Sequence, residues 1–153
     1  MAFIKVERMQ LPDFKKSTTN KIHANAFKTV GLVWHRELRL KRFTVRGGRE
    51  LGFAERSKKY MRLKMKKLRH SRPLEFTGRS KAASGSKRLQ TTRNSVRIIH
   101  PLVRAFNFKP KNSKVDMRKE FGTVSSPEIR KLEGVHAKRV EEQYQKQLTY
   151  QAN

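Results

Sequence analysis

Apolar side chains recur at helical spacing in two long stretches of the chain, one in each half. In the first half the set is Ile22, Ala26, Phe27, Val30, Val33, Trp34 and Leu38. This spacing predicts an amphipathic helix over residues 22–38, with capping residues available at 17–20. Gly31 lies inside it, where glycine weakens a helix by about 1 kcal/mol relative to alanine and lets another element approach closely. Cations crowd the end of the stretch, where the helix dipole favours them: Arg36, Arg39, Lys41 and Arg42.

The second stretch begins with a sharp start signal near residue 126. Ser126 is a suitable N-cap, Pro127 fits the first helical position and Glu128 places negative charge near the positive end of a helix. The apolar positions that follow step by three or four residues and are Ile129, Leu132, His136, Val140, Tyr144 and Leu148. They predict an amphipathic helix over roughly residues 127–148, with Gly134 as its weak point.

A third helix is predicted over residues 57–69, and it is strongly basic. Residues 56–72 hold nine Lys or Arg among seventeen residues and no acid. Ser57 is a suitable N-cap, and Pro73 places the end of the helix near His70. Thr77 and Gly78 then predict a turn, because glycine adopts positive φ freely. One narrow apolar stripe is expected to pack against the protein core, and it consists of Met61, Met65 and Leu68.

The remaining segments read as strands, loops and an arm. Residues 87–108 carry β-branched and aromatic side chains typical of strands, notably Val96, Ile98, Leu102, Phe106 and Phe108. Residues 115–121 are a further candidate strand, and the apolar beginning at Phe3, Ile4 and Val6 is a strand or an extended arm. Glycine and small polar residues predict flexible loops over residues 43–55 and 79–86.

These elements together predict one domain spanning residues 1–153, with an N-terminal arm over residues 1–16. The expected fold class is α+β. It has long N-terminal and C-terminal amphipathic helices, a central basic helix and a small antiparallel β-sheet, with extended arms.

Charge changes this picture, because the chain is far more basic than an ordinary domain. The formal net charge is +26, and only 35% of the residues are hydrophobic. The charge is uneven, since residues 115–153 hold seven basic and six acidic side chains and residues 1–114 carry the other +25. Self-repulsion of this size destabilises an isolated compact chain and favours an anionic or acidic partner.

Several function classes find little support in the sequence. There are no cysteines for disulfides or thiolate metal sites. No apolar run approaches the ~18 residues of a membrane-spanning helix, and the N-terminus lacks the apolar core of a signal peptide. The acids form no paired cluster, and no histidine has a catalytic or metal-binding spacing: His23, His35, His70, His100 and His136. We therefore expect no enzyme, with no catalytic residue, cofactor or metal ligand.

Nucleic-acid binding fits the charge better. Basic residues interleaved with Tyr60, Phe76 and Phe43 suit phosphate contact and base stacking, although no standard DNA-reading or RNA-reading motif is present. The predicted charge contacts, to DNA or to an acidic protein, are Lys58, Lys59, Arg62, Lys66 and Arg69. The predicted packing and assembly anchors are Phe27, Trp34 and Tyr144.

Residues 34–80 contain short motifs whose order resembles that of a known protein family. They are Trp34-His35-Arg36, Arg42-Phe43-Thr44, Gly52-Phe53, Arg56-Ser57-Lys58-Lys59-Tyr60, and Pro73-Leu74 followed by Thr77-Gly78. This order is similar to that of the neck, head-completion and tail-completion proteins of tailed bacteriophages. The usual Leu-Arg after Thr-Gly is replaced here by Arg79 and Ser80.

The resemblance implies a structural virion protein without enzymatic activity. Such a protein forms a homo-oligomeric ring in the neck, contacts neighbouring head, connector and tail proteins, and lies near DNA without reading its sequence. It would be assembled in the host cytoplasm and reside in the virion. Composition alone favours a different class, an RNA-binding protein of a ribosome-like ribonucleoprotein particle. Both remain expectations at this point.

Overall fold

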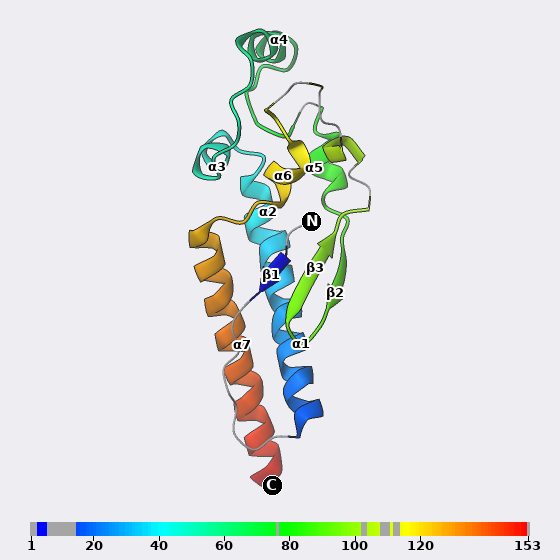
Figure 1. Ribbon diagram of the computed structural model, residues 1–153, viewed down its shortest axis with the longest axis vertical. Helices are drawn as coiled ribbons and strands as arrows, with labels where there is room; N and C mark the ends of the chain where they lie inside the picture. Colours follow the sequence, from blue (N-terminus) through cyan, green and yellow to red (C-terminus); the bar gives the residue numbers. More distant parts are fainter. Residues whose placement is uncertain are drawn as a thin grey trace.

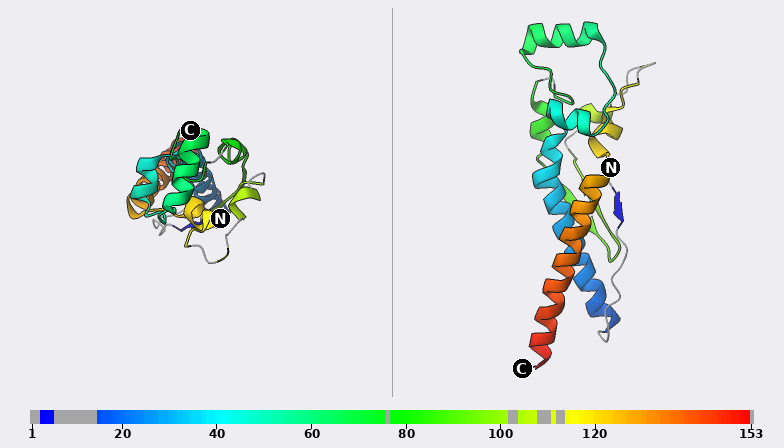
Figure 2. Two further views of the ribbon diagram at one scale, coloured as in Figure 1. Left: turned by 90° about the horizontal axis from the view of Figure 1, so that it is seen from above. Right: turned by 90° about the vertical axis from the view of Figure 1, so that its left-hand side faces the viewer.

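Two long antiparallel helices dominate the structure, a computed structural model that describes residues 3–5, 15–75, 77–101, 104–107, 111 and 114–152 (Figure 1). A small antiparallel sheet lies beside the first of these helices, and the shorter helices gather at one end of the molecule (Figures 1 and 2). The fold is mixed α+β and mostly helical, as the sequence pattern predicts.

The first long helix confirms the prediction over residues 22–38 and extends it at both ends. It consists of α1 (Lys16–Val33), a π-helical turn η1 (Trp34–Leu38) and α2 (Arg39–Lys41), joined end to end. Buried positions recur every fourth residue along it, at residues 22, 26, 30, 34 and 38. A regular α-helix over-rotates by about 40° in each such step, because it has 3.6 residues per turn. The wider π turn over Trp34–Leu38 counteracts this drift in the last of these steps.

The second long helix, α7 (Ser126–Ala152), confirms the prediction over residues 127–148. Its start lies one residue earlier than expected, because Ser125 acts as the capping position. The Ser125 N–H donates to Glu128 Oε2 at 3.2 Å, and the Ile129 N–H donates to the Ser125 carbonyl at 2.9 Å. This is the reciprocal half of a capping box, in which the third helical side chain reaches back to the cap.

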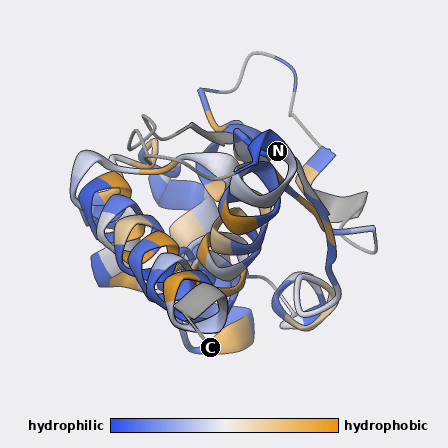
Figure 3. Ribbon diagram, turned by 90° about the horizontal axis from the view of Figure 1, so that it is seen from below, coloured by the Kyte–Doolittle hydropathy of each residue, from blue (hydrophilic) through white to orange (hydrophobic). Residues whose placement is uncertain are grey.

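The apolar face of α7 packs on α1 only along its middle. Leu132, His136 and Val140 are buried, whereas Ile129 and Leu148 are 37% and 42% exposed. Hydrophilic and hydrophobic positions are mixed on both long helices when the molecule is seen from below (Figure 3).

The sheet has three strands in the order β1-β3-β2, and all pairs are antiparallel: β1 (Phe3–Lys5), β2 (Arg88–Thr91) and β3 (Ser95–Ile99). Its central strand buries Val96 and Ile98 against α1. Gly31 permits this close approach, because a Cβ added there would lie 2.8 Å from Val96 Cγ2. The strand prediction is thus confirmed over residues 88–99. Leu102, Phe108 and Val6 lie outside the described residues.

Three sequence predictions are wrong in the same way: the structure has short helices in two segments predicted to be loops and in one predicted to be a strand. The predicted loop 43–55 contains α3 (Val45–Glu50), the predicted loop 79–86 contains α5 (Arg79–Ala83), and the predicted strand 115–121 is α6 (Met117–Gly122). Side-chain caps explain two of them. Thr44 Oγ1 accepts from the Gly47 N–H at 3.0 Å, and Asp116 Oδ1 accepts from the Lys119 N–H at 2.9 Å.

The core lies where the first long helix meets the sheet, α6 and α7. It also takes in a 3-10 turn, η2 (Arg104–Asn107), within the region predicted to be strand. Phe27 and Trp34 are each 1% exposed and so pack as predicted, while Tyr144 is half-buried near the far end of α7. The fully or nearly fully buried aromatic and aliphatic set of the main cluster is Phe27, Val30, Trp34, Leu38, Phe43, Leu74, Val96, Ile98, Phe106, Phe121 and Leu132.

Candidate nucleic-acid interface

The basic helix α4 (Lys58–Leu68) lies across one end of the molecule, away from the two long helices (Figure 2, right). Its boundaries follow the sequence signals. Ser57 Oγ accepts from the Tyr60 N–H at 3.2 Å, as expected of an N-cap. Arg69 adopts the left-handed conformation at φ 53°, and its N–H donates to the Met65 carbonyl at 3.0 Å. The helix therefore ends just before His70, close to the predicted position.

The inner face of α4 differs from the predicted apolar stripe. Met61 and Leu68 are half-buried as expected, but Met65 is 49% exposed and Lys64 is only 2% exposed. Lysine at this position buries its aliphatic stem, while its Nζ donates to the Arg72 carbonyl in the segment that follows the helix. The inner stripe is therefore Met61, Lys64 and Leu68, and the predicted packing of Met65 is wrong.

Burial affects the charge of Lys64. Desolvation is the main cause that lowers the pKa of this ammonium, and repulsion from Arg56 and Arg72 lowers it further, while Glu75 partly compensates. The ammonium also lies 5.7 Å from the centroid of the Tyr60 ring. Lys64 thus holds α4 against its own connecting segment and is not available to a partner on the outer face.

The outer face of α4 gathers the cations that the sequence singles out. Lys59, Arg62 and Lys66 are spaced by three and four residues, which places them on one side of a helix, opposite the buried Lys64. All five predicted charge contacts are exposed, and none forms an ion pair with another described residue: Lys58, Lys59, Arg62, Lys66 and Arg69.

Two acidic side chains fix the segments that lead into and out of α4. Glu120 on α6 accepts from Arg56 and, at 3.1 Å, from the Ala54 N–H. Glu75 accepts from Arg72 at 3.1 Å. Leu74 at φ 52° and Gly78 at φ 81° turn the outgoing chain, and the latter confirms the predicted glycine turn. These contacts present α4 at a fixed place although the helix itself has little packing.

The aromatic side chains proposed for base stacking are mostly not available. Tyr60 is 37% exposed at the edge of α4. Phe43 is 1% exposed and packs against Phe106 and Phe121, so its predicted contact with nucleic acid is wrong. Phe76 lies outside the described residues. The surface is therefore suited to phosphate contact more than to base stacking.

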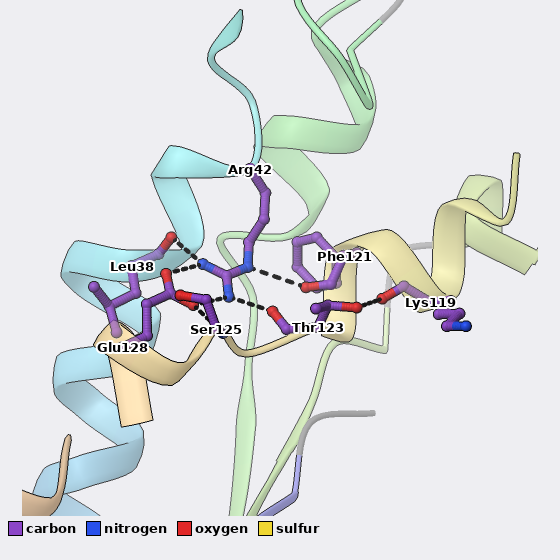
Figure 4. A network of polar contacts seen from close by, with 7 residues as sticks. All are labelled: Leu38, Arg42, Lys119, Phe121, Thr123, Ser125 and Glu128. Atoms are coloured by element: carbon purple, nitrogen blue, oxygen red, sulfur yellow. Dashed lines mark hydrogen bonds and ion pairs between the residues drawn. The ribbon is translucent and has the colours of Figure 1, made fainter. Parts of the chain in front are cut away.

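Sequence reasoning missed a buried charge network beside this region, centred on Arg42 (Figure 4). The guanidinium is fully buried and makes two 2.8 Å hydrogen bonds to the Glu128 carboxylate. It also donates to the carbonyls of Leu38, Phe121 and Thr123. The sequence predicted only that Arg39 and Arg42 lie at the end of a helix, where the dipole favours cations. Both are buried, and the pairing with residue 128 requires a contact that sequence spacing does not reveal.

Four of the histidines form two stacked pairs in the interior. The rings of His23 and His136 join α1 to α7, and those of His35 and His100 join η1 to the end of β3, each pair with centroids 5.5 Å apart. Burial lowers the pKa of His136 and His100, and it is the main cause that lowers the pKa of His35 to about 4. His35, His100 and His136 therefore serve as neutral packing groups at neutral pH.

The described residues contain no group of three or more His, Cys, Asp or Glu side chains placed to hold a metal ion. Within the same part of the chain, no helix has the length and apolar character needed to cross a membrane. Comparison with known proteins yields no family, because no family model, no curated protein and no solved structure matches the chain.

Proposed function

We propose that the chain is a non-enzymatic structural protein of a tailed-bacteriophage neck, where copies form a ring that joins head to tail. In this proposal the outer face of α4 lies against DNA. One observation carries the DNA contact: five exposed cations that form no ion pair with a described residue lie on α4 and at its C-terminal cap, away from the core. Like charges gathered in this way repel one another, and a nearby anion offsets the cost of this repulsion.

The form of the surface suits a phosphate backbone. Lysine and arginine side chains that reach phosphates displace condensed counterions, which gives affinity without sequence preference. Among the described residues, Tyr60 is the one exposed aromatic side chain that accompanies the cations of α4, so base readout adds little. A protein that must hold DNA of any sequence needs such a surface.

The neck assignment rests on the order of motifs around α4, and three of the motif residues have a clear local role. Arg56 pairs with Glu120, Ser57 caps the helix, and Gly78 supplies the left-handed turn. These three residues therefore contribute to the start of the basic helix and to the turn of the chain that follows it. Assembly is supported by exposed apolar side chains at both ends of the molecule, which copies or neighbours would cover: Leu63, Met65, Leu148 and Tyr150.

DNA binding is tested with duplexes of random sequence, measured by fluorescence anisotropy over a series of salt concentrations. The test variant changes four outer cations to glutamine: Lys59, Arg62, Lys66 and Arg69. We expect the slope of log affinity against log salt to fall by roughly 3 to 4, because each lost phosphate contact removes about 0.9.

The matched control removes the same charge from the long helices through Lys21, Lys28, Lys138 and Lys146, all exposed. Equal slopes for the two variants would contradict the role of α4. The ring is tested separately by native mass spectrometry and by locating the subunit in a particle reconstruction. A stable monomer, or a position outside the neck and tail, would refute the neck assignment. Co-purification with ribosomal RNA at high salt would favour the ribonucleoprotein alternative.

A further inference from the structure

A groove of about 270 Å³ lies between α3 and the inner side of α4, on the side away from Lys59, Arg62 and Lys66. Apolar side chains contribute much of its lining, and they come from three separate segments: Val45, Phe53, Tyr60, Met61 and Pro73. Cationic side chains line it as well: Arg49, Arg56, Lys64 and Arg72. One carboxylate, Glu55, lies among them, so the lining has a clear excess of positive charge.

The apolar part of the groove remains partly open in this chain. Val45 and Tyr60 are 38% and 37% exposed, and Met61, Phe53 and Pro73 are half-buried. Helix α4 makes no extensive contact with another described helix or strand. The groove therefore lies where a packed interface between α4 and the core would otherwise be. Apolar surface held open between two helices gains free energy when a partner covers it.

The cations differ in how far they are engaged within the chain. Arg56 is paired with Glu120, and Lys64 donates to the Arg72 carbonyl. Arg49 is exposed and forms no ion pair with a described residue, and the Arg72 side chain remains 46% exposed beside Glu75. An anionic group entering the groove would meet these two guanidinium groups first. It would also stabilise the charged form of Lys64, whose pKa is lowered by burial and by its cationic neighbours.

We propose that this groove binds an acidic peptide segment of a partner protein, which inserts one apolar side chain between α3 and α4. The charge of the lining selects against a basic or neutral segment, and the apolar floor selects against a phosphate chain, which would leave it exposed to water. This proposal is independent of the DNA contact, because the two surfaces lie on opposite sides of α4.

The probe is a short fluorescein-labelled peptide of glutamates around one central leucine, titrated with the full chain and followed by anisotropy. We expect binding that weakens at least tenfold when serine replaces the leucine. The Val45→Glu variant places a carboxylate in the groove and should also weaken binding about tenfold. The matched variant Leu40→Glu changes an equally exposed side chain outside the groove, and should stay within twofold of the wild type.

Should Val45→Glu fail to fold, Arg49→Glu in the groove is compared with Arg36→Glu outside it, since both arginines are exposed. Equal loss in a groove variant and its control would overturn the proposal. Equal affinity for the leucine and serine peptides would also overturn it, as would tighter binding of an oligothymidine of equal charge. Displacement of the peptide by a second copy of the chain would have the same consequence. Duplex-DNA binding measured on the same variants separates failure of the groove from failure of the proposed function.

Discussion

In the body of the molecule, formed by the two long helices with the sheet and α6, arginines are buried among acceptors that the same chain supplies. On α4, every lysine and arginine except the buried Lys64 is exposed and forms no ion pair with a described residue. Arg42 is fully buried and bonded to a carboxylate and three carbonyls. Arg62 and Lys66 are exposed on a helix without a single acid.

This difference shows which charged groups find their partners within the chain and which would gain from a partner outside it. A buried charge is tolerated only when its hydrogen bonds are satisfied within the fold, and the body achieves this at Arg42. The exposed cations of α4 form no ion pair with a described residue, and they repel one another. The stability of the body is therefore intrinsic, whereas α4 gains from an external anion.

The largest effect is expected from breaking the buried pair. Glu128→Gln keeps the shape of the side chain but leaves the Arg42 charge without its counter-ion. Loss of one partner of a buried pair typically costs about 3–5 kcal/mol, so the free energy of unfolding should fall by that amount in chemical denaturation.

Two control substitutions remove exposed charges, so that their effect on the free energy of unfolding can be compared with that of Glu128→Gln. Glu37→Gln removes a partner of Lys131 in an exposed pair, for which about 1 kcal/mol or less is expected. Lys66→Gln on α4 should change stability by no more than about 0.5 kcal/mol. A loss at Glu128 as small as these would show that the body does not depend on its internal pairing.

A smaller, pH-dependent effect is expected at His35. Its pKa in the folded protein is lowered from 6.5 to about 4, mainly by burial and next by Lys87. Unfolding therefore takes up a proton between these values, so the stability is fully present above about pH 6.5 and is lost as the pH falls toward 4. His35→Gln should remove a part of this acid loss, at most about 3 kcal/mol.

The measurement compares the free energies of unfolding of wild type and His35→Gln at neutral pH and near pH 4. Taking the difference between the two pH values cancels the packing change, which is the same at both. Identical acid losses in the two proteins would exclude His35 as a source of the pH dependence.

The smallest effect is expected from one substitution made in each long helix. Gly31→Ala places a Cβ 2.8 Å from Val96 Cγ2 and should destabilise the protein by about 1–2 kcal/mol. Gly134→Ala on α7 meets nothing within 4 Å and should stabilise it by about 1 kcal/mol through helix propensity. Thermal unfolding measures both, and equal signs would contradict the close packing of α1 on the sheet.

Local signals predicted much of the fold correctly because they act within a few residues. The apolar spacing around Phe27 and Trp34 predicted the first helix, and Ser57 and Gly78 marked the segment that presents α4. The same reasoning failed for α3 and α6, whose few residues carry no apolar period and depend on caps at Thr44 and Asp116.

At the candidate surface, too, some features were predictable from the sequence and others were not. Helix periodicity predicted that Arg62 and Lys66 lie off the apolar stripe of the basic helix, and both are exposed. It did not predict that Lys64, not Met65, would turn inward, because the carbonyl that accepts from Lys64 belongs to Arg72, in the segment beyond the end of the helix. The groove behind α4 likewise brings together side chains from separate segments and has no signature in the sequence.

The sequence by itself determined the two amphipathic helices, the basic helix with its cap, the glycine turn and the excess of positive charge. Only the tertiary structure decided which cations are buried and which are exposed. The reason is that burial of Arg42 requires Glu128, a residue far along the chain, and the exposure of α4 requires that no such acid reach its outer face.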